Sequence, residues 1–350
     1  MIRRRDCLVL CAAPALMHAQ DDGASALSKT LLEELATAQK TPGIAAAIRR
    51  ENDEVFSHAF GKRDRDAHLP ATPATHFRIG SLSKLLTTAA AGRLYERGAL
   101  DLDAPVQQYV PSFPSNDVPI TARQLLGHLS GIRHYGQNEY INTTHYATVR
   151  EGLKIFENSP LVQAPGAKYL YSSYGFNLLG AIIEGASKLE FTACVKREVL
   201  DPLGMKDTGV DESGPNISRF YASSNGAVGS APRVDNSDRM PSGGFLSTAS
   251  DLARFGAAHL SDGFLKPATR TLMFTSQKTA EGKETGVGLG WRIAQISGER
   301  IYHHGGDAMG GRAFLLLRPE RRISVAVVCN LSFARIAEAD AMSLSQPFVV

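Results

Sequence analysis

Strand-forming segments gather at the two ends of the chain, and this placement constrains the fold more than any other feature. Near the start, residues 43–50 (GIAAAIRR) and 54–62 (EVFSHAFGK) flank the polar turn ENDE, a pattern typical of a β-hairpin. Near the end, turn-forming residues separate four further strand-like segments, at residues 288–296, 299–304, 311–319 and 322–330. The two ends are therefore predicted to build one antiparallel sheet together.

The middle of the chain is mostly helical in pattern. Apolar residues recur at helical spacing in segments 81–97, 121–129, 147–158, 174–187, 191–200 and 248–260. We expect an α+β fold in which helices flank the antiparallel sheet and a helical lobe, roughly residues 102–285, is inserted into it. The domain would span residues 24–346, with a final helix near 332–344 on one face of the sheet. A site would lie in the cleft between sheet and lobe.

Composition excludes several classes of function. The 38 basic and 35 acidic residues leave a net charge of only +3, and no basic stripe argues for a nucleic-acid partner. No apolar run reaches the length of a membrane span, so no integral membrane segment is expected in the mature chain. No Cys/His cluster has metal-site spacing, so neither metal nor cofactor is expected. Cys194 and Cys329 are expected to be separate buried thiols.

The first residues, MIRRRDCLVLCAAPALMHAQDD, differ from the rest. Three arginines precede an apolar stretch that ends at Met17, and the small residue Ala19 follows. This pattern predicts a signal peptide over residues 1–19, and hence a secreted or periplasmic protein. Two alternatives stay open: an arginine-rich mitochondrial presequence and a lipid-modified Cys11.

The segment SLSK places Ser81 and Lys84 one turn apart, on one face of a helix that is predicted to begin at Ser81. The residues that follow, LLTTAAAGRL, are small and apolar nearly all round, which is typical of a buried helix. The positive end of that helix favours negative charge developing near the serine oxygen. Burial would lower the pKa of Lys84, as a lysine base requires. The alternative is a capping serine followed by a surface lysine.

Three segments resemble, in order, the catalytic motifs of penicillin-binding proteins and serine β-lactamases. The resemblance is greatest to the class C-like branch, which includes esterases and D-amino-acid peptidases. SLSK (81–84) is similar to Ser-x-x-Lys, YSS (171–173) to Tyr-x-Asn, and HHGG (303–306) to Lys-Thr-Gly or His-x-Gly. Flanking stretches such as LLGHLSGI, SGGFLSTASDL and GLGW are also similar, so the resemblance covers residues 41 to 330.

The resemblance implies an acyl-enzyme mechanism with a role for each motif. Ser81 would be the nucleophile. Lys84 and Tyr171 would act as one coupled unit that takes the serine proton and returns a proton to the leaving group. His303 would favour the phenolate of Tyr171 or bind a substrate carboxylate, with a charge that changes between about pH 5 and 8.

The third motif also implies an oxyanion hole, formed by the amide of Gly306 with that of Ser81. Gly305 and Gly306 would let a substrate lie close to the strand. His304 is expected on the opposite face of the strand from His303, in a structural role.

Two further positions qualify the reading. Ser173 stands where the family usually has asparagine, and a hydroxyl has only one proton to donate, which weighs against β-lactam hydrolysis. His134 either lines the cleft or is structural, and His128 is expected to be structural.

We therefore expect a serine hydrolase that acts on a small-molecule or peptide substrate without a cofactor. The stretches LDLDAPVQQYVPSFP and VDNSDRMPSGGFLSTASDLARFG are very similar to a branch of the family in animal mitochondria that is regarded as peptidases. Peptidase or amidase activity is accordingly expected first, esterase activity second and β-lactamase activity third. An alternative of another class is a non-catalytic, peptidoglycan-binding relic of the fold.

Overall fold

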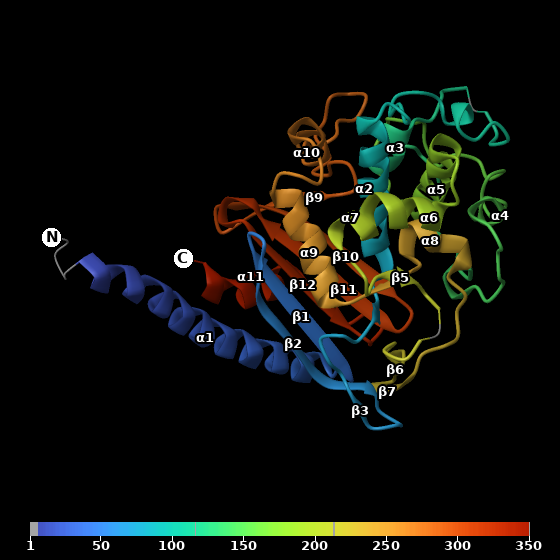
Figure 1. Cartoon of the computed structure of the whole chain (residues 1–350). Helices are drawn as coiled ribbons and strands as arrows, with labels where there is room; N and C mark the ends of the chain where they lie inside the picture. Colours follow the sequence, from blue (N-terminus) through green and yellow to red (C-terminus); the bar gives the residue numbers. More distant parts are fainter. Residues whose placement is uncertain (1–5, 116, 213, 350) are drawn as a thin grey trace.

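A seven-stranded sheet with helices on both faces organises the molecule (Figure 1). The structure is a computed structural model that describes residues 6–115, 117–212 and 214–349. The strand order is β3-β2-β1-β12-β11-β10-β9, and every neighbouring pair is antiparallel. The strands are β1 (Gly43–Arg50), β2 (Asp53–Asp64), β3 (Leu69–Pro70), β9 (Arg292–Ile296), β10 (Glu299–Ala308), β11 (Gly311–Arg318) and β12 (Ile323–Cys329).

The two ends of the chain meet inside this sheet. Strand β1 pairs with β12, with Ile44 opposite Cys329 and Arg50 opposite Ile323. Both strands are buried over most of their length, and their apolar side chains suit this position at the centre of the sheet. The predicted α+β fold, with its sheet assembled from both termini, is confirmed.

The helices cover both faces of the sheet, and most of them lie between the two groups of strands in the sequence. They are α1 (Asp6–Gln39), α2 (Ser83–Glu96), α3 (Ala122–Leu126), α4 (Val149–Leu153), α5 (Ser173–Ser187), α6 (Phe191–Val195), α7 (Asp201–Leu203), α8 (Met240–Gly243), α9 (Ala249–Leu260), α10 (Pro267–Met273) and α11 (Glu338–Ser345). Short strands form two small sheets, β4 (Phe77–Arg78) with β8 (Phe245–Ser247) and β5 (Gly209–Val210), and β6 (Tyr221–Ser224) with β7 (Ala227–Ser230).

Alternate residues of the central strands serve two different cores. Ala45 and Ala47 pack toward α2 and α9, whereas Ile44 on the other face packs toward α1 and α11. Helix α9 lies close to the sheet because a Cβ on Gly256 would stand only 2.1 Å from Ser324 Oγ. A small residue at this contact therefore allows α9 to pack closely against the strands.

Several element boundaries differ from those predicted. The helix expected at 147–158 is the five-residue α4, and the one expected at 332–344 begins only at Glu338. Strand β10 continues to Ala308, past the predicted end at residue 304, because glycines 305 and 306 carry no side-chain pattern that could indicate a strand. Helix α1 was not predicted beyond the leader, yet Leu32 on it is fully buried against the sheet.

The predicted leader, residues 1–19, lies outside the residues whose side chains the structure describes. In the described part of the chain, no helix has both the length and the apolar character needed to cross a bilayer. Cys194 and Cys329 are separate, buried, free thiols, as predicted.

Candidate active site

A sharp turn places Ser81 against the sheet. The chain leaves β4, passes through a 3-10 turn at Gly80–Leu82 and enters α2. Gly80 has a φ of +49°, and a Cβ there would lie 2.4 to 2.9 Å from backbone atoms of Asp307 on β10. Only glycine fits this contact without strain. Ser81 is therefore held where the start of α2 meets the edge of the sheet.

Lys84 is fully buried in the first turn of α2. Its Nζ lies 3.1 Å from Ser81 Oγ, 3.0 Å from Ser173 Oγ and 2.7 Å from the Ser242 carbonyl oxygen. Among the described residues no carboxylate approaches it within 4.0 Å. Burial, and next the positive charge of Arg239, hold the pKa of Lys84 well below its ordinary value. Burial therefore favours the uncharged form of this amine beside the serine.

Tyr171 and Ser173 flank the beginning of α5. Between them, Ser172 caps the helix, because its Oγ accepts from the Gly175 amide at 3.0 Å. This cap turns Tyr171 toward the nucleophile, and its hydroxyl donates to Ser81 Oγ at 2.8 Å. Burial raises the pKa of Tyr171, so the phenol keeps its proton at neutral pH.

The two neighbouring histidines of β10 lie on opposite faces, as predicted, but the assignment of those faces was wrong. The His304 ring is on the Tyr171 side, with ring centroids 6.4 Å apart. His303 instead points to the α11 face, where its Nδ1 lies 3.3 Å from a Glu338 carboxylate oxygen. His304, rather than His303, is the histidine of the nucleophile site.

The sequence HHGG offers two frames for a His-x-Gly motif, which explains the error. A Cβ on Gly306 would lie 1.9 Å from the Ile79 carbonyl oxygen, so Gly306 is the glycine pressed against the turn before Ser81. A Cβ on Gly305 would instead meet the side chain of Arg312 on the other face, at 3.2 Å. The motif frame is therefore 304–306.

Neither histidine changes charge near neutral pH. Burial lowers the pKa of His303 to about 4 and holds that of His304 well below its ordinary value. The Nδ1 of His304 lies 2.7 Å from the Gly305 carbonyl oxygen, so this nitrogen carries the proton and Nε2 is the free acceptor. The change of charge between pH 5 and 8 that was expected for His303 is therefore wrong.

The peptide groups of β10 point alternately to its two sides. A two-residue loop joins β10 to β11, so Ala308 and Gly311 beside it form a hydrogen-bonded pair. The alternation directs the Gly306 amide toward β11 and the Asp307 amide to the other side, beyond the last pairing with β9. The Asp307 backbone also lies against Gly80. The free amide beside the serine thus belongs to Asp307, a correction to the expectation for Gly306.

Two histidines hold the Tyr171–Ser173 segment from the helical side. His134 Nδ1 accepts from the Ser173 amide at 3.2 Å, and its ring lies 5.4 Å from that of Tyr171. His128 Nδ1 accepts from the Ser172 amide at 3.2 Å. Burial lowers the pKa of His134 to about 4, so its lone pair stays available for this bond. His134 both lines the cavity and supports the backbone.

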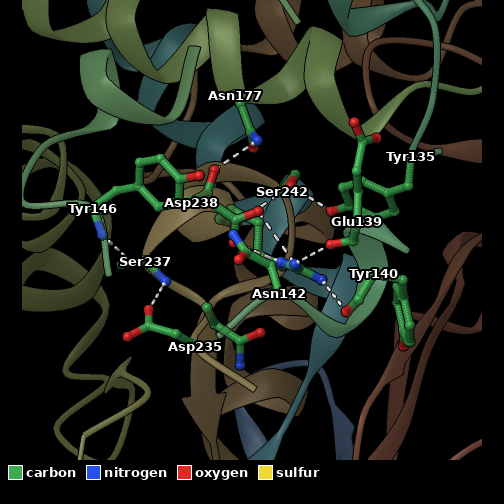
Figure 2. Close-up of polar contacts among 12 residues, drawn as sticks. Tyr135, Glu139, Tyr140, Asn142, Tyr146, Asn177, Asp235, Ser237, Asp238 and Ser242 are labelled. Carbon is green, nitrogen blue, oxygen red and sulfur yellow. Dashed lines mark hydrogen bonds and ion pairs between the residues drawn. The ribbon is translucent and has the colours of Figure 1, made fainter. Parts of the chain in front are cut away.

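Two segments form another wall of the site, within the loops around 134–145 and 210–240 from which the sequence predicts cleft walls. Figure 2 shows residues 139–142 bonded to residues 235–242, with Asn177 of α5 donating to the Asp238 carbonyl oxygen at 2.8 Å. Arg239, between them, donates to the carbonyl oxygens of Glu139 and Tyr140, at 2.9 Å each. The stretch DNSDRMPSGGF was noticed only as a similarity, because nothing in its pattern marks a side chain that acts through buried backbone contacts.

These groups open onto one cavity of about 370 Å³. Of the predicted site residues it is lined by Ser81, His134, Tyr171, Ser173, His303 and Gly305, and His304, which was expected to be structural, lines it as well. Lys84 lies behind Ser81, and Gly306 is covered by the turn. Of the residues not predicted, Arg239, Ser242, Arg292 and Asp307 also line the cavity. Within the described residues, no three acidic, histidine or cysteine side chains are grouped to hold a metal ion.

Known proteins share this sequence and architecture. A family model described as beta-lactamase matches residues 29–345. The human serine beta-lactamase-like protein LACTB, mitochondrial, is 30% identical over 416 aligned positions, which cover 87% of this chain and 76% of that protein. A penicillin-binding protein homologue from Pyrococcus abyssi is 27% identical, with a TM-score of 0.78 and coverage of 92% of this chain and 76% of that one. A penicillin-binding protein from Bacillus halodurans is 25% identical, with a TM-score of 0.76 and coverage of 91% and 98%.

The family match spans nearly the whole chain, and the solved structures share its sheet and helices. The predicted resemblance is therefore confirmed: this chain belongs to the β-lactamase family, which shares its fold with the penicillin-binding proteins.

Proposed function

We propose that this chain is a serine hydrolase that forms an acyl-enzyme on Ser81 and acts first on amide or peptide bonds. The observation that carries the proposal is the contact of one serine oxygen with two proton-transfer groups, Lys84 Nζ at 3.1 Å and Tyr171 OH at 2.8 Å. Such a constellation activates a hydroxyl that is otherwise a weak nucleophile.

The hydrogen bonds favour Lys84 as the base. An uncharged amine has two N–H groups and one lone pair. The Ser242 carbonyl can only accept, and Ser173 Oγ can accept, so these two oxygens use the N–H groups. The lone pair is then left for the Ser81 proton as Oγ attacks the substrate carbonyl carbon.

Tyr171 is suited to the opposite task. Its raised pKa keeps the phenol protonated before attack, so it can give a proton to the departing nitrogen or oxygen when the tetrahedral intermediate collapses. In the acyl-enzyme, Lys84 then keeps the proton taken from Ser81 and Tyr171 is left as the phenolate, which can accept a proton from the attacking water. Hydrolysis of the acyl-enzyme by water runs the same transfers in reverse, and Ser81 regains its proton.

Backbone amides complete the proposed chemistry. The negative oxygen of the intermediate would lie between the amides of Ser81, at the start of α2, and Asp307, at the open edge of β10. The neutral His304 would present Nε2 toward the phenol of Tyr171 and act as an acceptor rather than as a cation.

Ester hydrolysis is the second candidate, and Ser173 favours it. Where relatives present an asparagine amide, Ser173 presents one hydroxyl, which already accepts from Lys84 at 3.0 Å. This leaves less capacity to hold the amide group of a substrate. The leaving group of an ester is an alcohol, which needs less help from a proton donor than an amine does. Hydrolysis of esters would therefore be less affected by serine at position 173 than hydrolysis of β-lactams.

Labelling of the serine tests the proposal. A fluorophosphonate should add once to the wild-type chain, as seen by intact-mass spectrometry, and should not add to Ser81→Ala. Ser83→Ala is the matched control, because Ser83 lies two residues away and bonds the Phe245 amide rather than the site. Absence of any adduct on the wild type would instead favour a non-catalytic, peptidoglycan-binding role.

Turnover then ranks the substrates. We expect hydrolysis of peptides or amino-acid amides first, p-nitrophenyl esters second and a chromogenic cephalosporin last. A cephalosporin hydrolysed faster than both other classes would contradict this order.

For location, the short apolar stretch that follows the first arginines and precedes Ala19 supports export to the periplasm or outside the cell. The mitochondrial alternative is supported by the arginine-rich start and by the name of the human relative. The mature N-terminus of the protein purified from its own cells decides between them.

A further inference from the structure

Arg239 lies between the two segments that form one wall of the cavity. It ends the short turn Ser237–Arg239, directly before α8, and its side chain is only 5% exposed. Its Nε lies 2.8 Å from Asp238 Oδ1, and its Nη2 lies 3.2 Å from Oδ2. The guanidinium is thus buried together with a carboxylate that satisfies one of its edges.

The other edge of the same guanidinium reaches the facing segment. Nη1 donates to the Tyr140 carbonyl oxygen and Nη2 to that of Glu139, both at 2.9 Å. The guanidinium carbon lies 5.0 Å from the Tyr135 ring centroid and 5.7 Å from that of Tyr140. A planar fork can meet a carboxylate, two carbonyls and two rings together, whereas an ammonium group cannot.

A short stretch of backbone links Arg239 to the lysine. Ser242 follows three residues later, and its Oγ donates to the Arg239 carbonyl oxygen at 3.3 Å. The carbonyl oxygen of Ser242 accepts from Lys84 Nζ at 2.7 Å. On the other side, the Asp238 carbonyl oxygen is held by Asn177 of α5, the helix that begins with Ser173. Anchoring the guanidinium therefore anchors the acceptor of the lysine.

We propose that Arg239 is a positioning residue for Lys84, because it joins residues 139–142 to residues 235–243 and thereby fixes the Ser242 carbonyl against the amine. The inference rests on the function proposed above, but it concerns a residue outside the three catalytic motifs.

The charge of Arg239 acts in the same direction as its geometry. After burial, its positive charge is the next cause that lowers the pKa of Lys84, and no carboxylate opposes it among the described residues. The remaining titratable groups that face the lysine are held neutral by burial, namely His128, His134, Tyr135, Tyr171 and His304. Loss of Arg239 should therefore let Lys84 keep its proton to higher pH.

A titration without turnover tests this directly. In protein labelled with 13C at lysine Cε, the Lys84 signal is identified by its absence in Lys84→Met. We expect the titration midpoint of this signal to rise by about one pH unit in Arg239→Met. In Arg239→Lys the midpoint should stay near that of the wild type, because the charge is kept.

Acylation kinetics test the geometric part. The rate of fluorophosphonate labelling should fall about tenfold in Arg239→Lys, because the planar guanidinium fork is lost. In Arg239→Met, the acidic limb of the pH profile of the labelling rate should shift to higher pH. Should Arg239→Met fail to fold, Arg239→Lys still decides, since labelling at the full wild-type rate would overturn the proposal.

Arg133→Met is the matched control. Arg133 also binds the 139–142 region, through the Glu139 carboxylate at 2.7 Å, but it does not line the cavity. This variant should lower the midpoint temperature of thermal unfolding without moving the Lys84 titration.

An unmoved Lys84 titration in Arg239→Met, together with a wild type that is labelled by the fluorophosphonate, overturns the inference alone. A moved titration with an unlabelled wild type overturns the proposed function and leaves the inference standing.

Discussion

At the scale of the residue, the burial of Lys84 links stability to pH. In the folded protein, burial holds the pKa of this amine well below the value of about 10.4 that it has in the unfolded chain. Between these two values the unfolded state binds the extra proton, so the free energy of unfolding rises with pH, and the contribution is lost as pH falls toward the lowered pKa.

We therefore expect the free energy of unfolding of the wild type, relative to that of Lys84→Met, to increase between about pH 7 and pH 9. The increase should be up to about 1.4 kcal/mol per pH unit. Urea unfolding of both proteins across this range measures the difference. The range stops below the pH at which the raised pKa of Tyr171 acts in the opposite direction. Parallel pH dependences would mean that Lys84 is charged in the folded protein.

The two histidines of β10 give a second prediction. His304 faces Tyr171, and His303 faces Glu338 on the far side of the strand. His304→Ala should slow acylation of Ser81 roughly 100-fold, at the lower end of the usual range for a group that assists proton transfer. His303→Ala should slow it less than about threefold, and the reverse order would restore the frame first read from the sequence.

The predicted residues that the structure brings together share one property, and so do those that the sequence did not indicate. Ser81, Lys84 and Tyr171 sit at helix beginnings with a recognisable spacing, and the structure brings all three together. Asp307 acts through a backbone amide that leaves no trace in the residue type. Arg239 acts through contacts with distant carbonyl groups, which no local pattern encodes.

At the scale of the element, the turn before α2 is the most constrained joint of the site. Gly80→Ala would place a Cβ within 2.4 Å of the Asp307 carbonyl oxygen and impose a φ of +49° on a residue that avoids it. We expect a loss of about 2 to 4 kcal/mol in the free energy of unfolding, together with slower acylation.

Gly98→Ala provides the comparison for this variant. Gly98 also has a positive φ, +71°, but a Cβ there meets nothing within 4 Å. It should cost only about 1 kcal/mol, the strain of the backbone alone. Equal losses in the two variants, measured by urea unfolding, would mean that the contact with β10 is unimportant.

Strands were predicted more accurately than helices, for a physical reason. The strands of the main sheet have continuous apolar or alternating runs, and β1, β11 and β12 begin and end within a residue or two of their predicted bounds. Helices such as α4 are only five residues long and are shaped by caps and tertiary contacts rather than by periodicity. The assembly of one sheet from both ends of the chain followed from the two clusters of strands. The face of β10 that meets the nucleophile depends on a register that the double histidine obscured.

At the scale of the whole molecule, α1 completes the second face of the sheet. Leu32 is fully buried there, and Ser28 Oγ donates to the Leu344 carbonyl oxygen of α11 at 2.8 Å. Leu32→Ala should lower the free energy of unfolding by about 2 to 5 kcal/mol. Leu27→Ala, at a position 52% exposed on the same helix, should change it by less than about 0.5 kcal/mol. Similar values for the two would place α1 outside the cooperative core.

The pairing of β1 with β12 also determines when, during synthesis of the chain, the proposed active site can be completed. The serine and lysine emerge from the ribosome early, but the strand that supplies the Asp307 amide, and the partner that completes the centre of the sheet, are synthesised last. Under the proposed function, an incomplete product that stops short of residue 300 would therefore carry the nucleophile without its oxyanion amide. Reactivity would then be withheld until translation is nearly finished.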